Sequence, residues 1–347
     1  MDKNAIVRLG LDLNRGVKTF EIEDKTFSES EAVEVLRQAL IDANGGSTTF
    51  DYKSLRRNKV AIFEIIEELV SAIIQEGLDG SQFWNEYVDY KNLKLGDKNE
   101  FYTDGDTTFV VCEVAEGNST PRRQRLGARK KVSVPTTVHM IRMYDHFARF
   151  MGGRIDWAQL CNKVAEAFQK EIWLDIATAF SGITSDNIIG NASTYLVTFS
   201  GGSGSFDEDD LIDLVAHVEA ATGEKARIFG TKQTLKKITT AIVADSAKED
   251  LYNQGYIGKF YGTEVFEIPQ AHKPGTDTFA IDPNSNTLHV IAAGDKFIKF
   301  VTEGDTLIDD REYTQNADST IEYRMTQKFG AAIMFASKGY GRYTLGT

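Results

Sequence analysis

The chain contains little cysteine and little proline. Its 347 residues include two cysteines, Cys112 and Cys161, and five prolines. The cysteines lie far apart and outside any C-x-x-C pattern, which excludes a disulfide framework and a cysteine-rich zinc site. The sequence therefore favours a reducing compartment.

Long apolar runs are also missing. Residues 60–74 hold the densest one, and three glutamates interrupt it, so the run is too short and too charged to span a bilayer. Residues 1–16 mix acidic and basic side chains with the apolar ones and show no signal-peptide core. These features predict a soluble, intracellular protein with no membrane partner.

The length and composition are those of a globular protein of about two domains. Hydrophobic residues make up 41% and charged residues 26%, which excludes wholesale disorder and coiled-coil rods. The chain has 39 basic and 51 acidic residues, for a net charge of −12. Such a chain repels DNA phosphates on average, so any contact with nucleic acid must come from a local basic patch.

Apolar spacing predicts several helices. Ser28 and Glu31 form a capping-box pair that opens the first of them. The longest carries a straight apolar row, is closed by Ser181 and Gly182, and should be about 36 Å long. The expected elements are a helix over 32–44, a loop over 47–58, a helix over 60–76 that stops at Gly77, and the long helix over 157–180.

Residues 83–140 change to an extended, glycine-punctuated pattern that predicts β segments, including 107–114 and 132–138. This excursion has little apolar surface of its own to bury, and isolated hairpins are marginal in water, so we expect it to rest on something else. Within it, residues 116–131 carry one acid, Glu116, and six basic side chains: Arg122, Arg123, Arg125, Arg129, Lys130 and Lys131.

The second half of the chain reads as a mixed α/β layer. The Gly-Gly-Ser-Gly-Ser run at 201–205 is flexible enough to serve as a hinge before it. After the hinge we expect a helix over 206–222, a strand over 225–229, a helix over 231–242, strands within 259–268 and 279–301, and a long strand over 319–336 that returns to the first domain's sheet.

No motif for catalysis, cofactor binding or metal binding emerges. The glycine cluster at 201–204 resembles a phosphate loop, but the following helix begins with Asp207, Glu208, Asp209 and Asp210, which already occupy the positive end of its dipole. Ser203 lacks the G-x-S-x-G frame of a hydrolase. None of the five histidines lies at zinc-site spacing, and none of the clustered carboxylates, such as Asp309, Asp310 and Glu312, is singled out as a catalytic acid.

The basic stretch 122–131 has three interpretations. It could bind nucleic acid, although it lacks interleaved aromatic residues for base stacking. It could pair with acidic surface on a neighbouring copy, for which residues 207–210 and the acids of 303–312 are candidates. It could also be a solvated loop that does nothing, because surface ion pairs often contribute little.

The order of these elements resembles the major capsid protein of tailed double-stranded DNA bacteriophages, the Hong Kong 97-type fold. The resemblance covers nearly the whole chain and includes the segments YIGKFYGTEVFEIP at 256–269 and TIEYRMTQKFGAAIMF at 320–335. It implies an α+β fold divided into an N-terminal arm at 1–58, a helix at 59–82 leading into the peripheral domain, an extended loop at 83–138, a peripheral domain at 139–205 with spine helix 157–180, an axial domain at 206–300, and a return to the peripheral domain at 301–347.

The resemblance implies a non-enzymatic shell subunit that forms pentamers and hexamers around packaged double-stranded DNA, with extended loops lying across neighbouring copies. Other implied partners are a portal protein, a separate scaffolding protein and a decoration protein. The expected location is the virion capsid, and the host cytoplasm during assembly. We expect the glycine pairs and clusters to let the two domains adjust, so the hinge candidates are Gly152, Gly153, Gly201, Gly202 and Gly204.

Two alternatives stay open. An encapsulin-like nanocompartment shell would share the fold and enclose a protein cargo instead of a genome. A soluble α/β enzyme would show a deep pocket with convergent polar groups.

Overall fold

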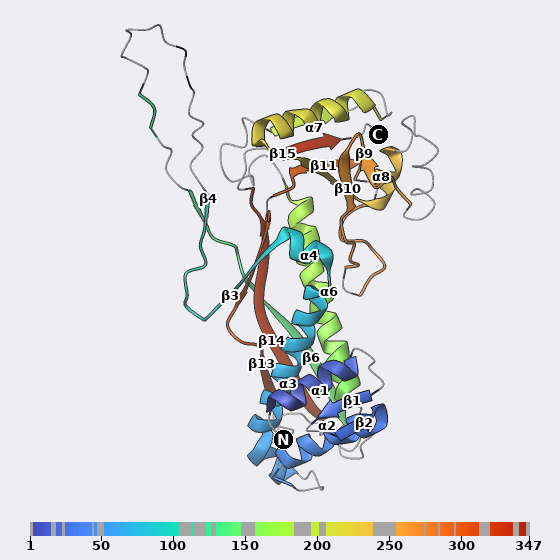
Figure 1. The fold of residues 1–347 in the computed structure, drawn as a ribbon. Helices are drawn as coiled ribbons and strands as arrows, with labels where there is room; N and C mark the ends of the chain where they lie inside the picture. The colour runs from blue at the N-terminus through green and yellow to red at the C-terminus, as the bar shows by residue number, and fades with distance from the viewer. Residues whose placement is uncertain are drawn as a thin grey trace.

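A computed structural model describes residues 3–14, 19–22, 25–43, 45–46, 52–103, 111, 113, 123–125, 130–146, 157–183, 196–200, 206–238, 255–273, 275–283, 285–294, 296–311, 320–335 and 340–344. The molecule is elongated, with one β-sheet along its length and a second sheet at one end (Figure 1). Its helices are α1 (Lys3–Asn14), α2 (Glu29–Ala43), α3 (Tyr52–Asp79), α4 (Gln82–Tyr87), α6 (Trp157–Ser181), α7 (Glu208–Thr222) and α8 (Lys232–Lys237).

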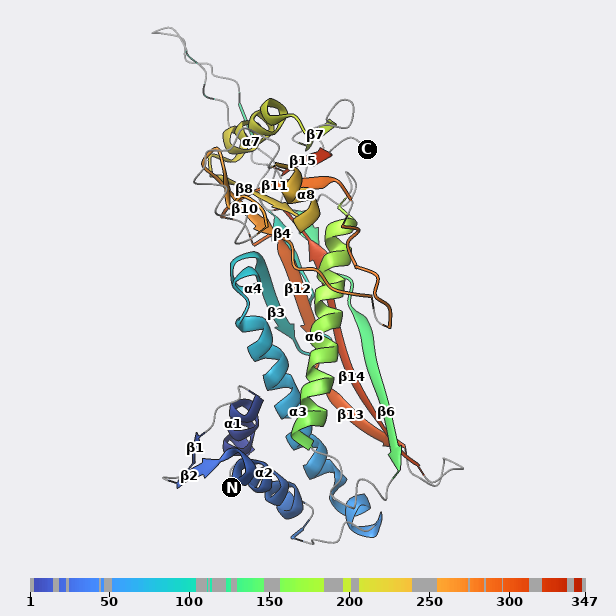
Figure 2. The same cartoon turned by 90° about the vertical axis from the view of Figure 1, so that its right-hand side faces the viewer.

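The first sheet has five strands in the described part of the chain. They are β3 (Val88–Leu93), β6 (Thr137–His146), β12 (Ile298–Glu303), β13 (Leu307–Arg311) and β14 (Thr320–Ile333). β14 pairs antiparallel with β6 along one edge and with β12 and β13 along the other, and β3 runs parallel to β12. Helices α3 and α6 lie against one face of this sheet (Figure 2).

The second sheet has the strand order β7-β15-β11-β8-β10-β9. These strands are β7 (Leu196–Ser200), β8 (Ala226–Gly230), β9 (Lys259–Phe260), β10 (Thr263–Glu267), β11 (Thr287–Ala292) and β15 (Tyr340–Thr344). Helix α7 packs its leucine and valine face on one side of it. Alternate residues of the strands, including Phe229, Ile291 and Tyr340, point to the other side and join the core around α6. The two sheets therefore share one continuous apolar core.

Two short pairs complete the strands: β1 (Thr19–Ile22) with β2 (Lys25–Ser28), and β4 (Phe101–Thr103) with β5 (Lys130–Val132). The first belongs to the segment that we expected to form an arm at 1–58. Helices α1 and α2 of that segment bury Ile6, Leu9 and Leu36 against Ile62 of α3. The described parts of the expected arm are therefore helical and packed on their own chain.

Three of the sequence-based elements agree closely with the structure. The spine helix expected at 157–180 is α6, the helix expected at 206–222 is α7, and the long strand expected at 319–336 is β14. For α7, Asp207 is the N-cap, and its side chain accepts a hydrogen bond from the Asp209 N–H at 3.0 Å. Strong periodicity and a capping residue specify these elements locally.

The predicted boundaries of the second helix are wrong. Helix α3 begins at Tyr52, inside the expected loop 47–58, and runs past Gly77 to Asp79. Gly77 does not end the helix, because α6 crosses there and the side chain of Gln169 occupies the space that a Cβ would need. The Gln169 amide also donates to the Ile73 carbonyl at 3.1 Å. Gly77 is thus a close-packing glycine.

Residues 83–87, expected to be extended, form the short helix α4. Ser81 caps it, with its hydroxyl accepting from the Trp84 N–H at 3.4 Å. The helix buries Trp84 and Tyr87, which lie three residues apart on one face. This serine cap with aromatic residues at helical spacing is a signal that the extended interpretation missed.

Strand pairing differs from the expected segment boundaries at three places. β7 and β15 lie in the second sheet with the 206–292 strands, although they fall in the segments 139–205 and 301–347. β12, which begins inside the 206–300 segment, lies in the first sheet. The chain thus returns to the first sheet with β12, β13 and β14 and then enters the second sheet again with β15. The division into peripheral and axial domains remains a prediction.

Candidate assembly interface

The extended loop begins at a base that is fixed to the first sheet. Phe101 and Val134 pack with Val301 and Met334 in a small apolar cluster. The Asn99 side-chain amide donates to the Val134 carbonyl at 2.7 Å, and the Lys91 ammonium lies 4.5 Å from the centre of the Phe101 ring. Because both ends of the loop are held, β4 and β5 leave the body in a set direction (Figure 1).

Beyond this base, the described residues of the loop are exposed. Val111 is 95% exposed, and Glu113, Arg123 and Arg125 are also exposed. Lys131 forms an ion pair with Glu100 beside the base, which raises the pKa of Lys131. Of the other basic candidates, Lys130 contributes backbone to β5, and Arg122 and Arg129 lie outside the described residues.

The acidic candidates Asp207, Glu208, Asp209 and Asp210 form the start of α7 in the second sheet's layer. There they complement the positive end of the helix dipole. Glu208 also accepts a hydrogen bond from the exposed Tyr261 and raises the pKa of that phenol. Among the described residues, neither Arg123 nor Arg125 forms an ion pair with these acids.

A second acidic surface lies between α3 and the first sheet. It is a cleft of about 660 Å³ lined by Glu64, Glu67, Glu68 and Asp305, and none of its lining residues is basic. Burial raises the pKa of Glu67, and the three neighbouring carboxylates add to the effect, although the Ile308 N–H donates to Glu67 at 2.5 Å. The cleft is therefore a region of negative potential.

The helix-free face of the first sheet exposes an ordered set of side chains. Met140, Thr326 and Leu307 stand side by side on β6, β14 and β13. Met140 is 52% exposed and Leu307 is 55% exposed. The next row contains Arg324, which forms an ion pair with Asp309 at 2.5 Å. An apolar row bordered by charges is the usual composition of a surface that another protein covers.

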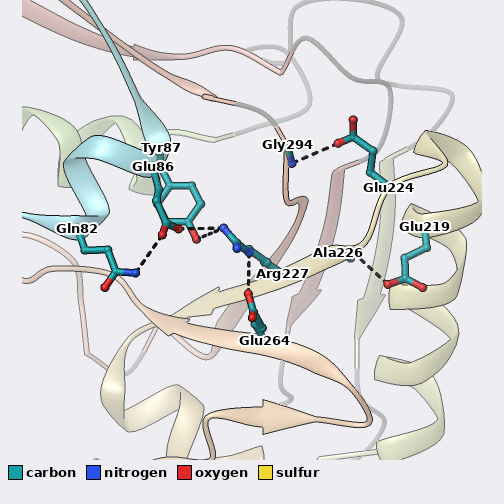
Figure 3. Close-up of polar contacts among 9 residues, drawn as sticks. All are labelled: Gln82, Glu86, Tyr87, Glu219, Glu224, Ala226, Arg227, Glu264 and Gly294. Carbon is teal, nitrogen blue, oxygen red and sulfur yellow. Dashed lines mark hydrogen bonds and ion pairs between the residues drawn. The ribbon is translucent and has the colours of Figure 1, made fainter.

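A polar junction joins α4 to the second sheet (Figure 3). Arg227 of β8 donates from Nη1 to Glu86 at 3.0 Å and to the Tyr87 hydroxyl at 2.7 Å, and from Nε to Glu264 at 3.0 Å. The bond from Gln82 and, secondarily, the arginine lower the pKa of Glu86. The guanidinium also lies 5.1 Å from the centre of the Phe266 ring. Sequence reasoning missed this junction because its members are about 140 positions apart.

The sequence indicated no metal site, no catalytic site and no membrane-spanning segment. Within the described part of the chain, no group of three His, Cys, Asp or Glu side chains could hold a metal ion. None of the described helices is long and apolar enough to cross a membrane. Cys161 is buried, and His289 is buried with its ring nitrogen 2.7 Å from the Tyr340 hydroxyl. Ser203, Cys112 and all five hinge glycines lie outside the described residues.

Comparison with known proteins decides the family. The model of the family described as "SPbeta prophage-derived putative capsid protein YonB" matches residues 6–341. The chain belongs to this capsid-protein family. No curated protein sequence matches the chain. The YonB family match and the arrangement of the elements make it a capsid shell protein.

One solved structure supports the fold, and two others are reported beside it. The structure titled "Capsid of native GTA particle computed with C5 symmetry" is 13% identical, covers 76% of this chain and 89% of its own, and has a TM-score of 0.50. The bacteriophage PhiM1 mature capsid is 11% identical, covers 76% and 87%, and has a TM-score of 0.48. A virus-like particle from Pyrococcus furiosus is 14% identical, covers 81% and 98%, and has a TM-score of 0.44. The α+β, Hong Kong 97-type fold expected from the sequence is confirmed.

Proposed function

We propose that this YonB-family chain assembles through pentamers and hexamers into an icosahedral virion shell that encloses packaged double-stranded DNA. The observation that supports this most is the loop whose base is held by Phe101 and Val134 while Val111, Arg123 and Arg125 face solvent. In this proposal, neighbouring copies cover the loop that projects from the 38.6 kDa subunit.

Sedimentation of the purified full-length chain tests this proposal. We expect particles in the megadalton range, or capsomers that convert to them. A stable monomer or dimer at every concentration would contradict it.

The basic loop supplies contacts between copies in this proposal. Arg123 and Arg125 carry no ion pair within the described chain, and the surfaces around Asp207–Asp210 and the α3 cleft are acidic. Opposite charges at two surfaces of the same subunit favour head-to-tail contacts that close into rings.

Charge reversal separates this contact from a solvated loop. The double variant R123E/R125E should reduce the yield of shells, and a matched reversal of acids on the partner surface, such as D209R/D210R, should partly restore it. The variant K94E, at an exposed lysine outside the basic stretch 122–131, serves as the control. Normal assembly of R123E/R125E would mean that the stretch is only solvated.

We also propose that Gly152, Gly153, Gly201, Gly202 and Gly204 let one sequence fit both five- and six-membered capsomers. The support is their composition, because consecutive glycines give the backbone the widest choice of conformations. Replacing each pair with alanine or valine should change shell size or closure. Unchanged particles would contradict the hinge role.

The remaining partners belong to the same proposal. They are a portal protein, a separate scaffolding protein, a decoration protein and weakly held double-stranded DNA, with assembly in the host cytoplasm. We propose that the chain has no catalytic activity and needs no cofactor. The nanocompartment alternative predicts particles that contain a protein cargo and no genome, which nuclease treatment and mass spectrometry of purified particles distinguish.

A further inference from the structure

A histidine on β6 lies between two carboxylates of α6. The Nδ1 atom of His139 is 3.6 Å from Glu171 Oε1, and its Nε2 atom is 3.5 Å from Asp175 Oδ2. Glu171 and Asp175 are four residues apart, which places them on the same face of α6, one turn from each other. A single imidazole thus faces two acids, and the contact joins the first sheet to the long helix.

The imidazole ring is fixed in this position by its other neighbours. It stacks on the Phe329 ring of β14, with the ring centroids 3.9 Å apart and the planes inclined by 6°. The Thr137 hydroxyl lies 2.8 Å from Nε2. The side chain of His139 is 16% exposed, and those of Glu171 and Asp175 are 30% and 26% exposed. The arrangement is therefore built into the packing and partly shielded from solvent.

The other charged groups around the ring come from three elements. Three exposed side chains line the same groove as His139: Lys170 of α6, and His272 and Lys273 of the segment that follows β10. On β14, His139 pairs with the uncharged Gln327, and the neighbouring Lys328 forms an ion pair with Glu303. In the described part of the chain, the two carboxylates of α6 are the charged groups within ion-pair distance of the ring.

The protonation state of the ring decides whether this cluster is attractive. The two acids repel each other, and within the cluster a protonated imidazole is the group that offsets their charge. Burial raises the pKa of Asp175, His139 opposes this rise, and Glu171 adds to it. A neutral imidazole has one N–H and can donate toward one acid, whereas an imidazolium has an N–H on each side. The geometry is thus complementary to the protonated ring.

We propose that His139, Glu171 and Asp175 form a clamp whose strength is set by a proton on the imidazole. With the proton, the ring bridges both acids and holds the start of β6 against α6. Without it, the acids repel each other and the edge of the first sheet is held less tightly. Because α6 and β6 both run along the length of the subunit, the clamp fixes the sheet edge relative to the long helix (Figure 2). This inference concerns the single subunit and does not depend on assembly.

The direction of the pH dependence follows from the proton that the clamp needs. A histidine side chain ordinarily takes up a proton below about pH 6.5. The stabilisation is therefore present in mild acid and is lost as the pH rises. At still lower pH it is lost again, because the carboxylates take up protons.

Denaturant unfolding of the unassembled subunit at pH 5.5 and pH 8 tests the clamp. The folding equilibrium constant of the wild type, divided by that of H139Q, should be about 5-fold larger at pH 5.5 than at pH 8, as expected for two partly exposed ion pairs. Comparing two variants at each pH cancels the effect of groups that titrate elsewhere. The variant H272Q, at the exposed histidine of the same groove, is the matched control, and its ratio should not change with pH. A ratio for H139Q that is the same at both pH values would overturn the proposal.

Replacing the acids tests whether they are the partners of the ring. In the background E171Q/D175N, the effect of H139Q should be the same at pH 5.5 and pH 8, because no carboxylate is left to pair with the imidazolium. A pH-dependent effect of H139Q that persists in this background would overturn the assigned partners.

Hydrogen exchange provides a test on the wild-type chain, without any substitution. After correction for the intrinsic effect of pH on exchange, the protection of the β6 amides at 137–141 relative to those of β8 should be about 5-fold higher at pH 5.5 than at pH 8. Equal relative protection at the two pH values would contradict the clamp even if H139Q failed to fold.

Discussion

Removing Arg227 should destabilise the subunit at the junction between α4 and the second sheet. The variant R227M keeps an unbranched side chain over Phe266 and deletes three charge-assisted hydrogen bonds, to Glu86, Tyr87 and Glu264. Bonds to charged groups contribute about 1.5–3 kcal/mol when buried. The two carboxylates are 33% and 44% exposed, which reduces each ion pair to about 1 kcal/mol or less. We expect a total loss of about 2–3 kcal/mol.

Thermal unfolding of the unassembled subunit measures this loss. For a chain of this length, 1 kcal/mol corresponds to about 2 °C or less in Tm, so R227M should melt below the wild type by at most about 4–6 °C. The variant K299M, which removes a 2.7 Å pair with Asp89 inside the first sheet, is the matched control for a cationic side chain lost elsewhere. A Tm equal to that of the wild type would refute the assigned role of Arg227.

The ion pair between Arg227 and Glu86 predicts that the stability of the subunit depends on pH. The pKa of Glu86 is lowered in the folded chain, so its contribution is present at neutral pH and is lost as the pH falls through the folded pKa, below about 4.3. The difference in stability between the wild type and R227M should therefore become smaller at acidic pH. A difference that stays constant between pH 7 and pH 3 would show that charge plays no part.

Three further outcomes are expected. The variant G330A should unfold at a Tm several degrees lower, because a Cβ there would press on the Pro135 carbonyl and lie 3.2 Å from the Thr136 Cα. Burial lowers the pKa of His289 to about 4, so stability should fall by up to about 3 kcal/mol between pH 6.5 and pH 4, and H289N should abolish this dependence in denaturant titrations. The variant F101A should detach the base of the loop at a cost of about 3 kcal/mol, and should reduce shell yield seen by sedimentation more than it reduces far-UV circular dichroism.

Elements with strong local signals could be predicted from the sequence. The four-residue apolar row of α6, the aspartate cap of α7 and the alternation of β14 each specify an element without help from distant residues. The order of these elements was also enough to indicate the fold family. These elements could be predicted from local patterns because each one buries an apolar face whose spacing is visible in its own sequence.

Features that depend on distant partners could not be predicted. Gly77 looks like a helix end until α6 is placed against it. β15 pairs with β7 and β11, which lie about 140 and 50 residues earlier in the chain. The five residues of β15 contain no signal that would identify these partners. The exposed basic side chains and the acidic first turn of α7 could be read from the sequence, but their partners are on other copies in the proposed account.

The central claim is that neighbouring copies cover the loop beyond β4 and β5, whose described residues are exposed on the single subunit. Electron cryo-microscopy of particles assembled from the purified full-length chain tests that claim most directly. The account predicts closed shells of five- and six-membered capsomers in which the loop of each subunit lies on a neighbour. Particles in which every loop folds back on its own subunit, or a chain that forms no shell, would contradict it.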